Sequence, residues 1–288
     1  MNDLGFMTVA LYLDYMAKHS SDQSPEELKK EYDNAFSYIK EAGYEYVDLS
    51  SWEADSMGLK CWLLLLQKYE LKVSSYIHFE SFAELEKDLQ AGIKRAYEGV
   101  DKAALLGSEF LMIGIQDRGD IAENDPQKIR EKLTAYFNAI CEFAKGKKVR
   151  PVIENIPDAG LNLSKWEDVR AVMDSVPCLG YIFDSGTLLV AEQESKDYIS
   201  ALKDRLVYVH LKDMRETDDV TVFAFPSVSG KRLVNAPTGL GLVDVKTVLQ
   251  QLKEAGYTGR ISVEFCPDDD LPLSDSIRRS KKYLEELM

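Results

Sequence analysis

Short runs of apolar, β-branched or aromatic residues recur along the chain, and longer segments with helical patterns follow most of them. Eight such runs cover residues 7–11, 46–49, 72–78, 110–115, 150–154, 179–184, 206–210 and 260–265. Runs that are apolar throughout, without alternation, are typical of parallel strands covered by helices. Strands and helices in alternation predict βαβ units with right-handed connections.

The intervening segments carry signals for the start and the end of helices. The sequence Ser24-Pro25-Glu26-Glu27 can cap the free backbone N–H groups at a helix start. Residues 164–167 repeat the capping-box pattern before a later helix. Gly43 and Gly256 stand where a helix should stop just ahead of a strand. A closing helix is expected over 274–288.

Eight units of this kind predict an α/β chain folded as a single (β/α)8 barrel domain over residues 1–288. An open doubly wound sheet is the alternative, but no GxGxxG sequence follows the first strand. The seventh connection, 214–241, is long, and 220–225 with 231–235 could form a hairpin there. This loop or hairpin insertion after strand 7 is either a binding element or a poorly ordered segment.

Composition narrows the class of protein. The chain of 288 residues is 45% hydrophobic, enough for a sizeable core, and its formal charge is -14. Such a charge disfavours nucleic acid and anionic membranes as partners, although it is also an ordinary aid to solubility. The 4 cysteines are scattered without a CxxC pair, which argues against a disulfide framework or a thiolate zinc site. We expect a cytoplasmic protein without a signal peptide or membrane span.

Four apolar runs in succession end in a side chain that can bind metal. These residues are Glu154, Asp184, His210 and Glu264. The carboxyl ends of barrel strands converge on one mouth, where three carboxylates would repel one another unless a cation lay between them. Each residue alone has an ordinary explanation, as a helix cap, an ion-pair partner or a core histidine. Four at spacings of one βα unit predict a site for one divalent ion.

The donor set constrains the metal and the kind of site. Three carboxylates and one imidazole suit Mn²⁺, Mg²⁺ or Co²⁺, and Zn²⁺ is an alternative. Because thiolates are missing, open positions for water or substrate are expected, as in a catalytic site.

At these residues the chain resembles the xylose isomerase-like TIM-barrel superfamily of sugar phosphate isomerases and epimerases. The resemblance covers essentially the whole chain, and it is densest at Val209-His210-Leu211-Lys212-Asp213 and over 237–244. It implies that Glu154, Asp184, His210 and Glu264 hold one divalent metal. It also implies proton transfer beside a sugar carbonyl through an enediolate, with Glu154 and Glu264 as catalytic acid and base on opposite faces.

One position departs from the family pattern. Many members have Asp-x-x-His at the sixth strand, where this chain has Asp184-Ser185-Gly186-Thr187. Thr187 cannot act as an imidazole acid or base. With 3 histidines in all, the trinuclear zinc cluster of the endonuclease branch is also excluded by this route.

Further residues near the predicted mouth are candidates for binding substrate, each with a plain structural alternative. His78 could contact substrate or be a packed core residue, and Trp52 could stack on a sugar or simply pack. Gln116 ends strand four, where a polar loop needs no other explanation. Lys212 and Arg215 could bind a phosphate or carboxylate, or pair with nearby acids.

The leading hypothesis is therefore a metal-dependent isomerase or epimerase of a small ketose or related sugar. An inosose-dehydratase-like lyase is the second reading, because its first step is the same. A sugar-binding or partner subunit without turnover is the third. The expected partner is a small-molecule sugar, and a homo-oligomer is left open.

Overall fold

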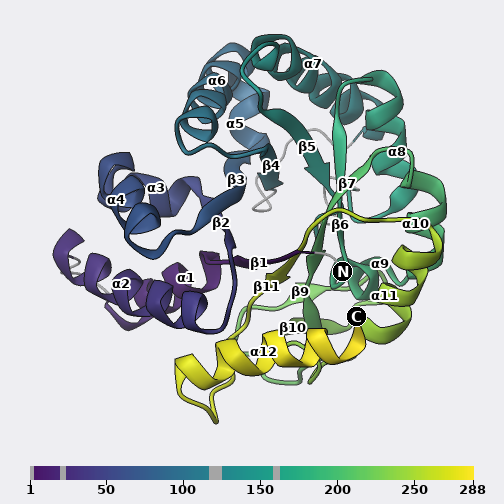
Figure 1. The fold of residues 1–288 in the computed structure, drawn as a ribbon. Helices are drawn as coiled ribbons and strands as arrows, with labels where there is room; N and C mark the ends of the chain where they lie inside the picture. Colours follow the sequence, from purple (N-terminus) through teal and green to yellow (C-terminus); the bar gives the residue numbers. More distant parts are fainter. Residues whose placement is uncertain (1–2, 20–23, 117–124, 158–162) are drawn as a thin grey trace.

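The computed structural model describes residues 3–19, 24–116, 125–157 and 163–288, and its centre is a closed barrel of eight parallel strands. Going round the barrel, the strands follow the order β1-β11-β7-β6-β5-β4-β3-β2 (Figure 1). All neighbouring pairs run parallel. The predicted (β/α)8 barrel is confirmed.

The barrel strands are short, and every one contains buried residues. Their bounds are β1 Leu4–Met7, β2 Tyr46–Ser50, β3 Lys72–Ser81, β4 Phe110–Gln116, β5 Arg150–Glu154, β6 Gly180–Asp184, β7 Leu206–Leu211 and β11 Ile261–Glu264. Seven of these lie within two or three residues of the predicted bounds, and β5 matches them fully.

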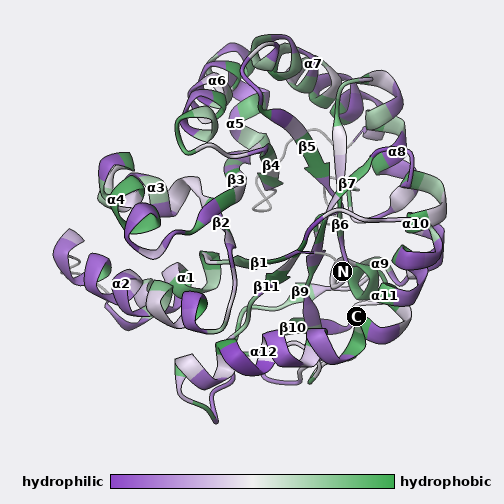
Figure 2. Ribbon diagram, in the orientation of Figure 1, coloured by the Kyte–Doolittle hydropathy of each residue, from purple (hydrophilic) through white to green (hydrophobic). Residues whose placement is uncertain are grey.

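Helices surround the barrel and turn their polar faces outward (Figure 2). Their bounds are α1 Val9–Lys18, α2 Pro25–Glu41, α3 Ser51–Met57, α4 Leu59–Tyr69, α5 Phe82–Lys87, α6 Leu89–Leu105, α7 Pro126–Ala144, α8 Trp166–Ser175, α9 Thr187–Ala191, α10 Ser195–Leu202, α11 Val245–Glu254 and α12 Leu273–Leu287. The Ser24 hydroxyl accepts the N–H of Glu27, so the predicted cap of α2 is confirmed. The capping box predicted at Ser164 is wrong, because α8 begins after Lys165 without a side-chain cap.

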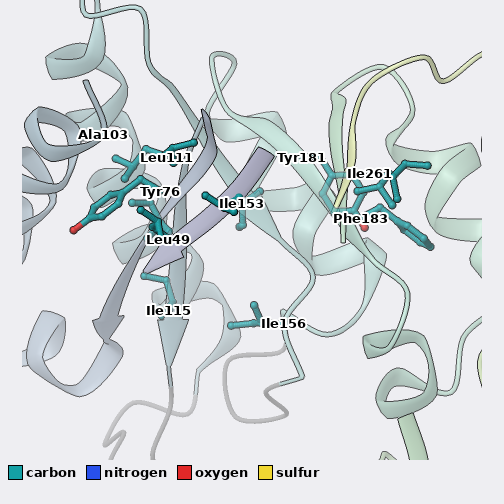
Figure 3. Close-up of a cluster of buried hydrophobic side chains, with 14 of the residues drawn as sticks. Leu49, Tyr76, Ala103, Leu111, Ile115, Ile153, Ile156, Tyr181, Phe183 and Ile261 are labelled. Carbon is teal, nitrogen blue, oxygen red and sulfur yellow. The ribbon is translucent and has the colours of Figure 1, made fainter. Parts of the chain in front are cut away.

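Two apolar layers hold the fold together. The larger one fills the space between strands and helices, where Figure 3 shows Tyr76 and Leu111 beside Ala103 of α6. The smaller one lies inside the barrel and consists of Met7, Ile77, Phe110, Met112, Val152, Ile182 and Tyr208. We call this second set the interior layer. It closes the barrel axis, so the two ends of the barrel are separate surfaces.

The first strand lies earlier than the sequence indicated. The predicted strand over 7–11 is wrong, because β1 ends at Met7 and α1 begins at Val9. Thr8 ends the strand by donating its hydroxyl to the backbone oxygen of Asp48 and to the carboxylate of Glu53. Residues 4–13 are apolar almost throughout, so the pattern alone gave no boundary.

The chain between β7 and α11 forms a three-stranded antiparallel sheet in the order β8-β10-β9. Its strands are β8 Asp213–Glu216, β9 Phe225–Pro226 and β10 Arg232–Ala236. The predicted hairpin is therefore only partly present, because β10 pairs mainly with β8 and meets β9 at two residues. Val220 and Phe223 are exposed instead of paired.

Two cysteines correct the expectation that the chain lacks disulfides. Cys141 of α7 and Cys178, just before β6, form a disulfide across 37 residues of sequence. Such a separation leaves no spacing signal in the sequence. Among the described residues, no helix is both long enough and apolar enough to cross a bilayer.

Candidate metal centre

The four predicted ligands stand at the carboxyl ends of neighbouring strands. Glu154 ends β5, Asp184 ends β6, His210 is the second-last residue of β7, and Glu264 ends β11. Glu154, Asp184 and His210 are buried, and Glu264 is partly exposed. Parallel strands in a closed barrel bring these ends to one mouth, which is why residues 110 positions apart share one site.

Three of the four side chains form a compact cluster. Glu154, His210 and Glu264 each offer a ligand atom, and these atoms all lie within 4.8 Å of one another. The Nδ1 atom of His210 is hydrogen-bonded to Oε1 of Glu154. The cluster therefore presents two carboxylates and one imidazole to a common point.

Asp184 is beside this cluster instead of in it. Its Oδ1 accepts the backbone N–H groups of Gly186 at 2.6 Å and Thr187 at 3.1 Å. Asn155 holds its backbone, because the amide donates to the Asp184 oxygen and accepts the Asp184 N–H, both at 2.9 Å. Its Oδ2 is free to face Lys212, 3.9 Å away. A rotation of the side chain would be needed to add Asp184 to the three grouped ligands.

Lys212 supplies a cation within the site. Its Nζ lies 2.5 Å from Oε1 of Glu264, and only 6% of its side chain is exposed. Burial opposes the charge, but Glu264 and Asp184 nonetheless raise the pKa of this ammonium above its usual value. The sequence indicated a substrate contact or a pairing with acids, and the structure places Lys212 in the second arrangement.

Asp48 is part of the site, and the sequence analysis missed it. This fully buried carboxylate of β2 lies 3.7 Å from Nε2 of His210. It accepts the Tyr208 hydroxyl at 2.9 Å and the Ser75 N–H at 3.1 Å. A signal was present, because a lone aspartate inside the apolar run Val47-Asp48-Leu49 needs a buried partner.

Burial and close charges shift the acid–base groups. Burial raises the pKa of Glu154, and Glu264 adds to the rise while His210 opposes it. Burial also raises the pKa of Asp184 to about 8. For His210, burial favours the neutral ring, but Glu154 and then Asp48 overcome it and raise the pKa to about 9. In the metal-free protein, Asp184 and His210 thus hold protons near neutral pH that a bound cation would displace.

The cluster fits a divalent ion. Carboxylates crowded in a buried site are stabilised by positive charge, and Glu154, Asp184 and Glu264 lie around Lys212 and His210. Among the described residues, Nε2 of His210 is buried without a hydrogen-bond partner. An oxygen and nitrogen donor set without thiolate suits Mn²⁺, Mg²⁺, Co²⁺ or Zn²⁺.

Two other predicted residues lie on the mouth side of the interior layer. Trp52 is half-buried at the start of α3 and stacks on Phe79, with ring centroids 4.0 Å apart. Phe79 in turn packs on the interior layer. Gln116 ends β4 with its residue partly exposed. Both positions are compatible with a substrate contact.

His78 packs outside the barrel, and Arg215 lies on the small antiparallel sheet. The His78 ring lies on the outer face of β3, 3.3 Å from where a Cβ on Gly99 of α6 would stand, and 3.7 Å from Glu80. Its neighbours Ile77 and Phe79 point inward, so His78 takes the second of the two arrangements that the sequence left open, that of a packed residue. Arg215 is exposed on β8.

Comparison with known proteins identifies the family. A family model described as a xylose isomerase-like TIM barrel matches residues 36–287. The chain belongs to this family. The resemblance inferred from the sequence is thereby confirmed.

Curated relatives are inosose dehydratases. The enzyme of Clostridium tetani is 25% identical over 224 residues, which cover 74% of each chain. The enzyme of Lacticaseibacillus casei is 28% identical over 163 residues, 55% of this chain and 54% of that one. The chain thus spans about half the length of the second relative.

Solved structures with the same fold include proteins with bound sugar or metal. D-allulose 3-epimerase from Methylomonas sp. in complex with D-allulose has a TM-score of 0.75 at 16% identity, covering 100% of this chain and 97% of that one. The IOLI protein with a bound zinc atom has 0.74 at 15%, covering 100% and 98%. A Mycobacterium smegmatis protein in complex with magnesium has 0.64 at 14%, covering 93% and 90%. At these identities the likeness shows the fold alone.

Proposed function

We propose that the chain is a divalent-metal-dependent enzyme that moves a proton at the carbon beside the carbonyl of a small keto sugar, as an isomerase or epimerase. The observation that carries the proposal is the cluster of Glu154, His210 and Glu264, with ligand atoms within 4.8 Å of one another at the barrel mouth. Relatives in the family are dehydratases, and epimerases share the fold.

Glu154, His210 and Glu264 would hold the ion, and Asp184 would join them after turning away from Gly186 and Thr187. When bound, the ion would polarise the substrate carbonyl and stabilise negative charge on its oxygen. We take Mn²⁺ as the first choice, with Mg²⁺, Co²⁺ and Zn²⁺ as alternatives.

The two glutamates are suited to proton transfer. Burial raises the pKa of Glu154, which strengthens it as a base near neutral pH. His210 bonds to Glu154 and fixes the direction of its carboxylate. Glu264 comes from the other side of His210, on β11, so the pair can act on two faces of one carbon. The Nζ of Lys212 lies 2.5 Å from Oε1 of Glu264 and holds this carboxylate in place.

Substrate contacts follow from the mouth-side residues. Trp52 offers a ring to the apolar face of a sugar, and Gln116 an amide. Thr187 is fully buried, and among the described residues its hydroxyl has no hydrogen-bond partner. We assign it to a substrate hydroxyl, as a neutral contact. Arg215, exposed on β8, stays a candidate for binding an anionic group of the substrate.

Metal content tests the site directly. We expect the purified protein, loaded with Mn²⁺ and passed through a desalting column, to retain about one ion per chain by mass spectrometry. Glu154→Gln and Glu264→Gln should each lower this occupancy by about tenfold or more, as loss of an anionic ligand does. Glu216→Gln changes an exposed carboxylate on β8 and is the control. Equal occupancy in all four proteins would disprove the site.

Dehydration is the second candidate, and the curated relatives favour it. Both reactions begin with the same proton abstraction, so incubation of keto sugars and keto polyols in D2O separates them. Deuterium uptake without loss of water indicates epimerisation or isomerisation. A new unsaturated or dicarbonyl product indicates a dehydratase. Metal and sugar binding without any C–H exchange would show a non-catalytic binding subunit.

A further inference from the structure

A second concave site lies at the end of the barrel opposite the metal centre. Its cavity has a volume of about 750 Å³, within the range of small-molecule sites. The walls come from the loop after α7, the start of β5, the chain entering β7 and the loop after α11. The disulfide between Cys141 and Cys178 links two of these walls. We call this space the base cavity.

The charge of the base cavity is opposite to that of the whole chain. Four basic residues line it, Lys145, Lys148, Arg150 and Lys203, against one acidic residue, Glu109. Glu109 is already paired with Arg260 at 3.0 Å. In a chain with a formal charge of -14, such a local excess of positive charge is unusual and concentrates anions there.

Arg150 is the central cation. It is half-buried at the first residue of β5, and among the described residues no acidic group pairs with it. Burial lowers its pKa, and the nearby Arg205 adds to that effect. A cation in this position without a counter-ion is costly, so an anion bound beside it would be stabilising.

The backbone of β6 leaves space for the Arg150 side chain at Gly180. A Cβ on Gly180 of β6 would stand 3.0 Å from the Arg150 Nε and 2.9 Å from a methyl group of Val207. The side chain therefore lies across Gly180, in a place that any larger residue would disturb. The Arg150 side chain thus packs on the backbone of β6.

The base cavity is independent of the metal centre. Arg150, Val152 and Glu154 share one face of β5, because alternate residues of a strand point the same way. Arg150 and Glu154 are thus roughly 13 Å apart along the strand. Val152 and Phe110 of the interior layer lie between the two ends, and Phe110 also lines the base cavity.

We propose that the base cavity binds a small, multiply charged phosphate compound. Arg150 would contact the phosphate oxygens through its planar guanidinium, and Lys148 and Lys203 would close around it from the rim. A guanidinium and several ammonium groups around one concave site are the chemistry that recognises phosphate. The volume admits a ligand of about the size of a sugar phosphate or a mononucleotide.

Titration calorimetry on the full chain tests this assignment. The probe is inorganic pyrophosphate, and the protein is first freed of metal because pyrophosphate chelates divalent ions. We expect one saturable site with a Kd below about 1 mM. Arg150→Gln and Lys203→Gln should each weaken binding by about tenfold, because each removes a charged contact to phosphate. Lys203 is exposed and unpaired among the described residues, so this variant tests the idea even if Arg150→Gln fails to fold.

Two controls remove the same kinds of charge elsewhere. Lys29→Gln, on the exposed face of α2, should leave the pyrophosphate affinity within about twofold. Glu264→Gln should also leave it unchanged, so a failure of the metal centre does not affect this result. Absence of saturable binding, equal binding by Arg150→Gln and Lys203→Gln, or tighter binding of citrate or duplex DNA than of pyrophosphate would each overturn the proposal.

Discussion

A substitution of Lys212 tests the electrostatics of the metal centre. The Lys212 ammonium lies 2.5 Å from Glu264 and 3.9 Å from Asp184, with 6% of the side chain exposed. Replacing it by Met keeps an unbranched side chain, one atom shorter, and removes the charge. In the metal-free protein, Lys212→Met leaves Glu264 and Asp184 without the ammonium that lies beside them.

Breaking a buried ion pair from one side costs about 3–5 kcal/mol, and we expect a loss of that size in the free energy of unfolding. The loss should shrink when Mn²⁺ is present, because the ion supplies the missing positive charge. The variant should also gain more stability from Mn²⁺ than the unaltered protein gains. An ion at a thousand times its Kd adds about 4 kcal/mol, so the difference is measurable.

The free energy of unfolding is measured with urea for the unaltered protein and for Lys212→Met, each in EDTA and in excess Mn²⁺. Lys231→Met is the matched control, because Lys231 pairs with Glu216 at 2.7 Å while both side chains are more than half exposed. That surface pair should contribute less than about 1 kcal/mol, with or without metal. If Lys212→Met costs no more than Lys231→Met in EDTA, or if Mn²⁺ does not reduce its cost, the charge argument fails.

Two further measurements follow from the same structure. The folded-state pKa values of His210 (about 9) and Asp184 (about 8) are raised above their ordinary values, so the metal-free fold binds extra protons whose stabilising effect is lost as the pH rises through them. Urea unfolding in EDTA should show falling stability from pH 6 to about pH 9, and a flat or rising profile would contradict these shifts. For the disulfide, thiol titration of the unfolded chain should find 2 free cysteines of 4, and reduction should lower the free energy of unfolding by up to about 4 kcal/mol. Four titratable thiols before reduction would show that Cys141 and Cys178 are not joined.

The barrel and the strand ends could be predicted because both leave a pattern of apolar runs and charged residues in the sequence. Glu154 and Asp184 each follow an unbroken apolar run, and a run that stops at a carboxylate marks the end of a buried strand. His210 is one residue before the end of β7, and the sequence still identified it as a candidate ligand.

What the sequence did not predict depends on which face of a strand points inward. Strands buried on both faces are apolar throughout, so no alternation tells inside from outside. The sequence therefore left His78 open between a substrate contact and a packed residue, and the structure packs it on Gly99. Asp48 was overlooked although it lies beside His210. The register shift between Val47 and Asp48 helps to set these faces, and it arises only when β2 and β3 pair.

The interior layer separates the mouth of the barrel from the base cavity. Because the interior layer lies between the two ends, substitutions at the start of the strands change the base cavity, and substitutions at their carboxyl ends change the mouth. The eight strands that build one core thus carry two surfaces whose sequences can diverge separately. Effects of mutations at Arg150 and Glu154 should then add, since the two residues share a strand but no partners. A chain of this design can acquire or lose a ligand at its base while the chemistry at its mouth stays the same.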